Sequence, residues 1–228
     1  MKIVYVDEQS EARDAWRRHV FVSDEFTLEE TEVLDPEPDL DQMIAMIEDL
    51  DPDALVTDQR LSEFKVGVAY DGTELVARFL SRRRHFPCFV TTNFAAEAAD
   101  RAPLDLDVNM IFSKEQLSDD EGDELAEQEL TFFGRVKRKV HAYQRLLQSR
   151  EEELMRLIGE AEGGPMPPQI ANRVMELDHE LEAMVGGRAK LPVDIKERAS
   201  APLAQLLERA EAILAELEQT MGPEQGRD

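Results

Sequence analysis

The chain has 228 residues and a formal net charge of −24, with 42% hydrophobic and only 6% aromatic residues. This length accommodates one large domain or two small ones, each with a real hydrophobic core. Both halves of the chain are acidic, which argues against nucleic acid or an anionic membrane as the main partner. No apolar stretch approaches the length of a membrane span.

The single cysteine, Cys88, lies inside the apolar run 86–90, which predicts a buried core thiol rather than a reactive one. One cysteine forms no internal disulfide, as expected for a protein of a reducing compartment. The first seven residues are too short and too soon acidic for a secretory signal. We therefore expect a cytoplasmic protein.

Strand and helix patterns alternate through the first half of the chain. Short apolar or β-branched runs predict strands at 2–6, 26–33, 54–57, 87–92 and 108–113. Helical periodicity predicts helices at 10–20, 40–50, 73–84 and 93–101, and residues 61–70 show no period and are predicted as a loop. This alternation predicts an α/β fold with a doubly wound, five-stranded parallel sheet.

Residues 119–222 carry a different pattern, in which apolar residues recur with heptad spacing. The pattern predicts an all-α coiled-coil or helical-bundle domain with helices at about 122–162, 168–185 and 193–220, followed by a disordered tail at 223–228. The heptads are compatible with pairing within one chain or between two. For pairing between chains, we predict a parallel homodimer joined through the long helix.

Polar residues follow several of the predicted strands. Asp58 ends the buried run 54–57, Asp7 and Glu8 follow the first strand, and Thr92 and Lys114 end the last two. In an open parallel sheet, chemistry gathers outside the carboxyl ends of the strands. The sequence therefore predicts one site at this edge, with Asp58 as its reactive centre.

Residues 1–118 resemble the response-regulator receiver domain of two-component signalling. The resemblance rests on five features in the expected order, namely Asp7-Glu8, Asp58, Asp71-Gly72, Thr92 and Lys114. It implies a flavodoxin-like receiver domain at 1–118, followed by the helical domain at 119–222.

The resemblance also implies a role for each residue at the site. Asp58 is expected to accept a phosphoryl group, Lys114 to pair with its oxygens, and Thr92 to hydrogen-bond the bound group. Mg²⁺ is the expected cofactor, because it prefers oxygen ligands. Its expected ligands are Glu8, Asp58, the backbone carbonyl of Arg60 and, through water, Asp7.

A histidine kinase or another phosphodonor is the partner that the resemblance implies. The helical domain shows neither a DNA-reading nor a catalytic motif, so we expect output through protein–protein contacts with a partner the sequence does not name. The chain is then a phosphoacceptor rather than an enzyme, at most catalysing its own phosphorylation from a donor and its own dephosphorylation.

Several positions depart from the family pattern. The segment from Ser62 to Tyr70 makes the connection after Asp58 longer than usual, Ile111 stands where the family has its switch aromatic, and Asn93 follows Thr92 where a small residue is common. The catalytic groups are therefore present while the readout groups are not standard, which predicts an atypical receiver with an output mechanism of its own.

Other interpretations stay open. The same fold could serve as a non-phosphorylated pseudo-receiver scaffold or dimerisation protein. A phosphatase with an aspartyl-phosphate intermediate is less consistent, because Asp7 is followed by Glu8-Gln9 and not by the Asp-x-Asp of many such enzymes. Two interpretations of His179 are also open. It is either an exposed polar residue beside the heptad seam or a histidine that carries a phosphoryl group.

Overall fold

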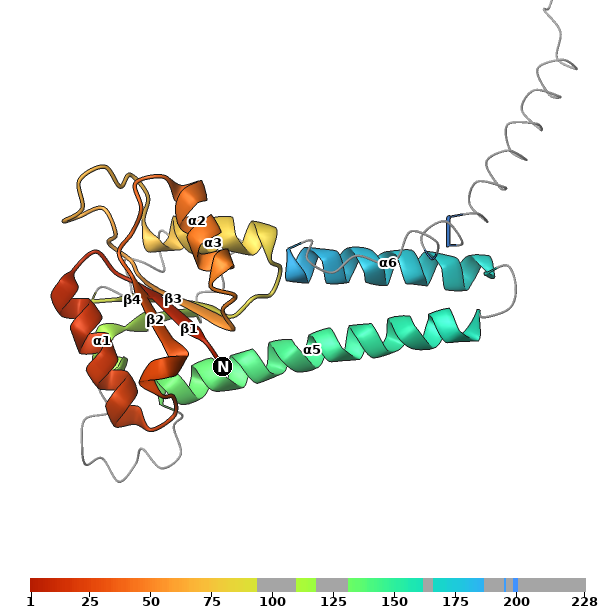
Figure 1. The fold of residues 1–228 in the computed structure, drawn as a ribbon, viewed down its shortest axis with the longest axis horizontal. Coiled ribbons are helices and arrows are strands. Elements are labelled where there is room, and N and C mark those ends of the chain that lie inside the picture. The colour runs from red at the N-terminus through yellow and green to blue at the C-terminus, as the bar shows by residue number, and fades with distance from the viewer. Residues whose placement is uncertain (94–109, 118–130, 162–165, 187–194, 196–198, 201–228) are drawn as a thin grey trace, which may run out of the picture. The chain divides into compact units, whose positions relative to one another are not determined.

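The computed structural model describes residues 1–93, 110–117, 131–161, 166–186, 195 and 199–200. It contains a five-stranded, all-parallel sheet with the strand order β2-β1-β3-β4-β5, and helices cover both of its faces (Figure 1). The strands are β1 (Ile3–Val6), β2 (Thr31–Leu34), β3 (Ala54–Asp58), β4 (Cys88–Thr92) and β5 (Ile111–Ser113). The predicted doubly wound sheet is confirmed.

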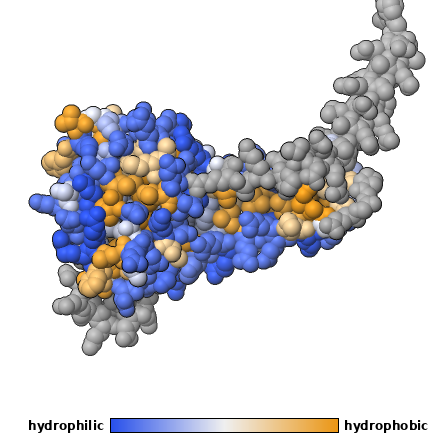
Figure 2. All heavy atoms as spheres, viewed as in Figure 1, coloured by the Kyte–Doolittle hydropathy of each residue, from blue (hydrophilic) through white to orange (hydrophobic). Residues whose placement is uncertain are grey.

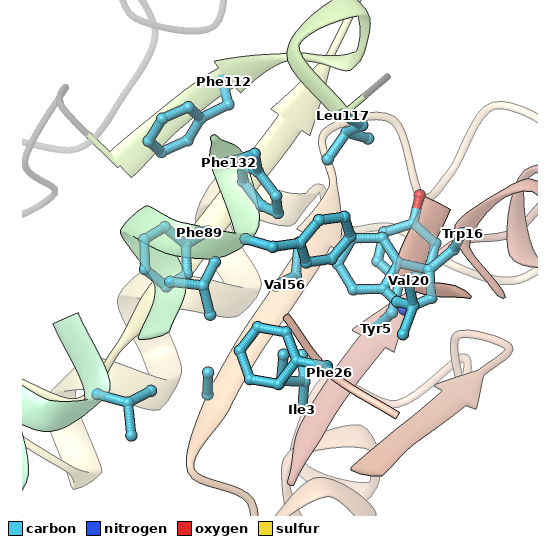
Figure 3. Close-up of a cluster of buried hydrophobic side chains, with 14 residues drawn as sticks. Ile3, Tyr5, Trp16, Val20, Phe26, Val56, Phe89, Phe112, Leu117 and Phe132 are labelled. Atoms are coloured by element: carbon cyan, nitrogen blue, oxygen red, sulfur yellow. The ribbon is translucent and has the colours of Figure 1, made fainter. Parts of the chain in front are cut away.

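One face of the sheet packs against α1 (Ser10–Ser23) and the start of α5 (Phe132–Glu160). Successive residues of a strand point to opposite faces, so alternate residues of each strand reach this side. Trp16 of α1 and Phe132 and Phe133 of α5 form its aromatic centre (Figure 3). The strands contribute Ile3, Tyr5, Ala54, Val56, Phe89 and Phe112.

The opposite face packs against α2 (Leu40–Asp49) and α3 (Gly72–Arg82). The strand residues on this side include Val4, Leu55 and Val90, and all three are fully buried. The helices bury Met43, Ile44, Ile47, Leu75, Val76 and Phe79. With apolar side chains on both faces, the central strands have the continuous hydrophobic runs typical of parallel sheets.

The first compact unit extends from Met1 to Leu146, beyond the predicted domain end at 118. The physical reason is that the start of α5 completes the sheet core, since Phe132, Phe133, Val136 and Val140 belong to the same cluster as Trp16. The heptad pattern shows that these residues are apolar, but it does not show that their partner is the sheet.

The second compact unit runs from Leu147 to Asp228, and its described part is a pair of helices. The later turns of α5 lie beside α6 (Pro168–Val185), with hydrophobic residues gathered between the two helices (Figures 1 and 2). Leu154 and Leu157 of α5 and Val174 and Leu177 of α6 share one buried cluster. These two seams therefore pair within one chain, and a homodimer stays a prediction.

Ion pairs also join these two helices. Arg173 of α6 donates two hydrogen bonds to Glu153 of α5, at 2.8 and 3.0 Å, and Arg150 of α5 lies 2.9 Å from Glu180 of α6. Arg150 interrupts the apolar heptad seam, but its charge is matched on the facing helix. His179 lies on α6 and is exposed.

Some predicted elements differ in their bounds or lie outside the described residues. Residues 28–30, predicted as strand, form a short 3-10 helix, η1 (Leu28–Glu30), capped by Thr27 and Glu30. α6 has the bounds expected for the second C-terminal helix. The predicted helix 93–101 past Asn93, the start of the helix 122–162, most of the helix 193–220 and the tail 223–228 lie outside the described residues. No helix in the described ranges is long and apolar enough to cross a membrane.

The packing of α5 on the sheet predicts a large cost for truncating Phe133, which is 1% exposed. Phe133→Ala should lower the free energy of unfolding by about 3–5 kcal/mol, measured by urea denaturation of the full chain. Phe21→Ala is the matched control, because that side chain is 74% exposed and should change stability by less than about 0.5 kcal/mol. Equal effects of the two substitutions would contradict the assignment of α5 to this core.

Cys88 is fully buried, and burial raises the pKa of its thiol. Because only the exposed thiolate reacts, a thiol reagent should modify the native protein at least about 100-fold more slowly than the urea-unfolded chain. Absorbance with an aromatic disulfide reagent measures both rates. Fast native modification would show that this strand is accessible.

Candidate functional site

The carboxyl ends of four strands meet at one edge of the sheet. Val6 pairs in register with Thr57, Asp58 with Thr91, and Thr92 with Ser113. Asp7, Asp58 and Lys114 therefore follow or end strands at the same level, although they are far apart in sequence. Parallel register thus brings together the polar groups that the sequence predicted at this edge.

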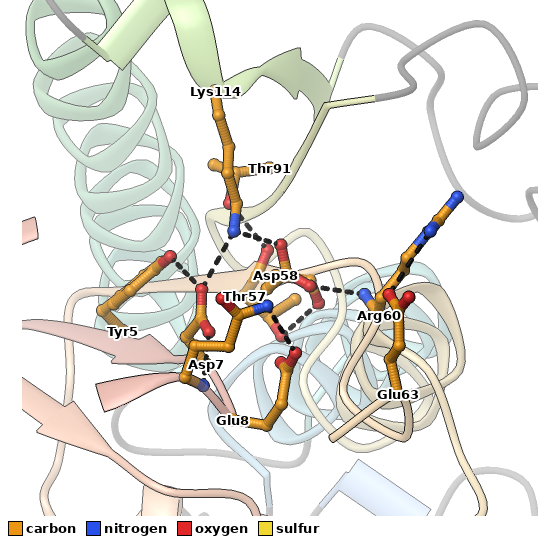
Figure 4. Close-up of polar contacts among 10 residues, drawn as sticks. Tyr5, Asp7, Glu8, Thr57, Asp58, Arg60, Glu63, Thr91 and Lys114 are labelled. Atoms are coloured by element: carbon orange, nitrogen blue, oxygen red, sulfur yellow. Dashed lines mark hydrogen bonds and ion pairs between the residues drawn. The ribbon is translucent and has the colours of Figure 1, made fainter. Parts of the chain in front are cut away.

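Lys114 lies between two buried carboxylates (Figure 4). Its Nζ is 2.6 Å from Oδ1 of Asp58 and 3.1 Å from Oδ2 of Asp7. Asp7 is fully buried, and Asp58 is 5% exposed. Two like charges in a poorly hydrated position need a shared counter-ion, and the Lys114 ammonium supplies it.

Burial and charge act in opposite directions on this group of residues. Burial raises the pKa of Asp58 and outweighs the effect of Lys114, which lowers it. For Lys114, burial lowers the pKa, but the nearby Asp58 and Asp7 raise it further, so the net shift is upward. The lysine is therefore held in its charged form at the point where a second negative group would approach Asp58.

Glu8 is also buried at this edge, and burial raises its pKa. Its Oε1 accepts a hydrogen bond of 3.1 Å from the Gln9 side chain, whereas its Oε2 is buried with no hydrogen-bond partner. An unpartnered carboxylate oxygen beside two other carboxylates fits the oxygen chemistry that Mg²⁺ prefers. In the described ranges, no group of three or more His, Cys, Asp or Glu side chains is arranged to hold a metal ion.

Arg60 lies directly beside Asp58. Its backbone N–H donates a hydrogen bond of 2.5 Å to Oδ2 of Asp58, and its carbonyl, the expected metal ligand, accepts a turn hydrogen bond of 3.3 Å from the N–H of Glu63. Thr92 ends β4 and is 2% exposed. The structure places both at the edge, and their roles stay predictions.

The Asp71-Gly72 pair fixes the start of α3 against the end of β3. Asp71 caps the helix by accepting a hydrogen bond from the N–H of Glu74, whose side chain bonds back to the N–H of Asp71. Gly72 approaches so closely that a Cβ there would lie 2.1 Å from the carbonyl oxygen of Asp58. Glycine at this position therefore keeps the backbone that carries Asp58 in place.

The extra segment after Asp58 is anchored to the loop between β2 and α2. Tyr70 donates a hydrogen bond of 2.7 Å to the carbonyl of Glu37, and Lys65 forms an ion pair with Asp35. On either side of Lys65 in the sequence, Phe64 and Val66 are 67% and 96% exposed. The segment is thus held in place by these two contacts, while two of its apolar side chains are exposed to solvent.

Two contacts at this edge were not predicted from the sequence. Tyr5 has the pattern of an ordinary strand residue, yet its hydroxyl donates a hydrogen bond of 2.6 Å to Oδ2 of Asp7, the oxygen that also faces Lys114. Gln59 connects the end of β3 to the start of α3: its side-chain amide donates a hydrogen bond to Asp71, and its backbone carbonyl accepts one from the N–H of Gly72. The sequence offers one indication of both contacts, because Tyr5 and Gln59 are polar residues within two positions of the predicted site residues Asp7 and Asp58.

These observations decide the fold family of the first unit. The strand order 2-1-3-4-5 is that of flavodoxin-like sheets, and here an acidic pair follows β1, Asp58 ends β3 and Lys114 follows β5. The first unit has a flavodoxin-like fold. The assignment rests on the strand order and on the side chains at the strand ends.

Two solved structures are similar to this chain. NtrX from Brucella abortus in complex with ATP matches with a TM-score of 0.37 and 21% identity, over 66% of this chain and 34% of that one. The two-component response regulator RcsB in a DNA complex matches with a TM-score of 0.36 and 21% identity, over 88% of this chain and 98% of that one. The chain thus spans about a third of the NtrX chain. No protein-family model and no curated protein matched.

The contact between Gly72 and Asp58 predicts that even a methyl group is harmful at this position. Gly72→Ala should lower the free energy of unfolding by about 1–3 kcal/mol or more, measured by urea denaturation, because the backbone of β3 or α3 must move. Gly159→Ala is the matched control, because nothing lies within 4 Å of its added Cβ; it should change stability by at most about 1 kcal/mol, in the stabilising direction. A Gly72→Ala protein as stable as the wild type would contradict this packing.

Proposed function

We propose that the chain is a phosphoacceptor signalling protein, in which Asp58 accepts a phosphoryl group and the helical region carries the signal to a protein partner. The observation that supports this most directly is the Lys114 ammonium held 2.6 Å from a buried Asp58 carboxylate at the carboxyl edge of the sheet. A cation in this position neutralises charge on an incoming phosphoryl group, and phosphoryl transfer depends mainly on such neutralisation.

The proposed reaction is a displacement at phosphorus. A carboxylate oxygen of Asp58 forms a new O–P bond, while the bond between phosphorus and the donor's leaving group breaks and the leaving group takes the electron pair. With acetyl phosphate as donor, the leaving group is acetate. In this proposal, Lys114 pairs with the phosphoryl oxygens and Thr92 hydrogen-bonds them.

Mg²⁺ is the cofactor in this proposal, with Glu8, Asp58, the Arg60 carbonyl and, through water, Asp7 as its ligands. When bound, it would neutralise charge that one lysine cannot balance alone. The buried, unpartnered Oε2 of Glu8 supports this assignment, because a cation would satisfy it. In this proposal, the chain accepts a phosphoryl group itself and does not catalyse a reaction of an external substrate.

The donor in this proposal is a histidine kinase or another phosphorylated molecule, and the output is a protein contact. One helix, α5, contributes to the core of the receiver and continues into the second unit, so it belongs to both. The net charge of −24 favours a protein rather than a nucleic acid as the output partner. Phosphorylation adds negative charge at Asp58 and biases the arrangement around Lys114.

Intact-mass spectrometry after acetyl phosphate treatment tests this proposal. The wild type should gain the mass of one phosphoryl group in the presence of Mg²⁺ and little or none with a chelator. Asp58→Asn should gain none, because the amide is not a nucleophile for this transfer. Lys114→Met should label at least about tenfold more slowly, because the charge of the phosphoryl group is no longer balanced.

Asp53→Asn is the matched control. Asp53 lies at the opposite end of β3, where its carboxylate accepts a hydrogen bond from the backbone N–H of Lys2, and its substitution should leave labelling unchanged. Labelling that persists in Asp58→Asn would place the acceptor elsewhere. No labelling of a folded wild type by acetyl phosphate under any metal condition would favour the pseudo-receiver scaffold.

A further inference from the structure

The site is connected to an aromatic stack by one buried hydroxyl. Tyr5 lies on β1, its side chain is 2% exposed, and its ring stacks on Trp16 with centroids 4.3 Å apart and planes 5° from parallel. At the other end of the same ring, the hydroxyl donates to Oδ2 of Asp7. One side chain therefore contacts both the ion-pair network and the core beneath α1 (Figures 3 and 4).

We propose that Tyr5 is a positioning residue that couples the charge at Asp58 to Trp16 and, through it, to the first turn of α5. This proposal rests on the proposed phosphoacceptor function and goes beyond it by naming the route of the signal. The route runs from Asp58 to Lys114, from Lys114 to Asp7, from Asp7 to the Tyr5 hydroxyl, and from the Tyr5 ring to Trp16.

The first step of the route follows from the sharing of one oxygen. Oδ2 of Asp7 accepts a hydrogen bond of 2.6 Å from the Tyr5 hydroxyl and also pairs with the Lys114 ammonium at 3.1 Å. A phosphoryl group on Asp58 adds negative charge, which draws Lys114 towards it and away from Asp7. A buried carboxylate that loses part of its counter-ion depends more on its remaining donors, so the bond from Tyr5 strengthens and shortens.

The second step follows from tight packing. Trp16 is 1% exposed and contacts Phe133 and Phe132, with centroids 5.2 and 6.2 Å away. A well-packed interior transmits a displacement rather than absorbing it. A small shift of the Tyr5 ring therefore reaches the residues with which α5 begins.

Ordinary packing alone does not require the hydroxyl, since a phenylalanine would stack on Trp16 equally well. The hydroxyl is aimed at a fully buried carboxylate on the adjoining stretch of chain. Its removal leaves the stack intact and takes away the connection, so Tyr5→Phe separates a structural role from a coupling role.

Trp16 is the only tryptophan of the chain, so its fluorescence, excited where tyrosine does not absorb, reports on the stack directly. In the full-length wild type, Asp58→Asn should change the Trp16 emission intensity or maximum, because Lys114 is then free to turn to Asp7. In the Tyr5→Phe background, the same Asp58→Asn substitution should give no change. This comparison needs no phosphorylation, so it is decided separately from the proposed function.

Phosphorylation provides the second measurement, made on samples whose labelled fraction is known from intact mass. Emission should change in proportion to the labelled fraction in the wild type, and that response should be lost in Tyr5→Phe. Tyr70→Phe is the matched control, because its hydroxyl bonds to the Glu37 carbonyl and not to the site; its response should be retained.

Two results would overturn the coupling. One is an unchanged Trp16 emission in Asp58→Asn, and the other is the same Asp58→Asn change with and without the Tyr5 hydroxyl. If the coupling comparison succeeds while acetyl phosphate never labels Asp58, the phosphoacceptor proposal fails and the Tyr5 route stands as a property of the ion-pair network. Circular dichroism and urea denaturation of Tyr5→Phe establish that its fold is retained.

Discussion

The Lys114 ammonium between Asp7 and Asp58 is the interaction on which the rest of the site depends. The two carboxylates sit at the ends of adjacent strands, β1 and β3, and both are almost completely buried. Without a cation between them, the sheet edge would hold two like charges in a position that water hardly reaches. The lysine satisfies both, and it follows β5, so the edge is complete only when β1, β3, β4 and β5 have assembled in register.

This dependence also explains why the backbone around Asp58 is so constrained. Gly72 leaves no room for a side chain against the Asp58 carbonyl, Asp71 caps α3 at the same point, and the Arg60 N–H holds the second oxygen of Asp58. Gly72 and the α3 cap constrain the backbone that carries Asp58, while the Arg60 N–H and Lys114 hold its carboxylate oxygens. For the acceptor role that we propose for Asp58, such preorganisation is favourable, because an in-line approach requires an oriented oxygen.

Much of this arrangement could be predicted from the sequence, because it follows from strand ends. A buried apolar run that ends in a carboxylate, as at Asp58, is enough to place that residue at the sheet edge. Two features could not be predicted in the same way. Val136 and Leu154 fit one heptad seam, and spacing alone does not reveal that the first packs on a sheet and the second on a helix. The bond from Tyr5 to Asp7 depends on the backbone after β1, where strand alternation no longer fixes the direction of a side chain.

The position of Tyr5 bears on how the proposed signalling protein could work without an aromatic residue at position 111. The side chain of Ile111 has no polar atom, so it cannot form a hydrogen bond that changes with the charge at Asp58. Aromatic residues instead pack on the sheet face beneath α1 and the start of α5, where Tyr5, Trp16, Phe132 and Phe133 form a continuous set of ring contacts. Because Phe132 and Phe133 open α5, the same helix whose later turns pack against α6, a readout on this side acts on the element that both units share.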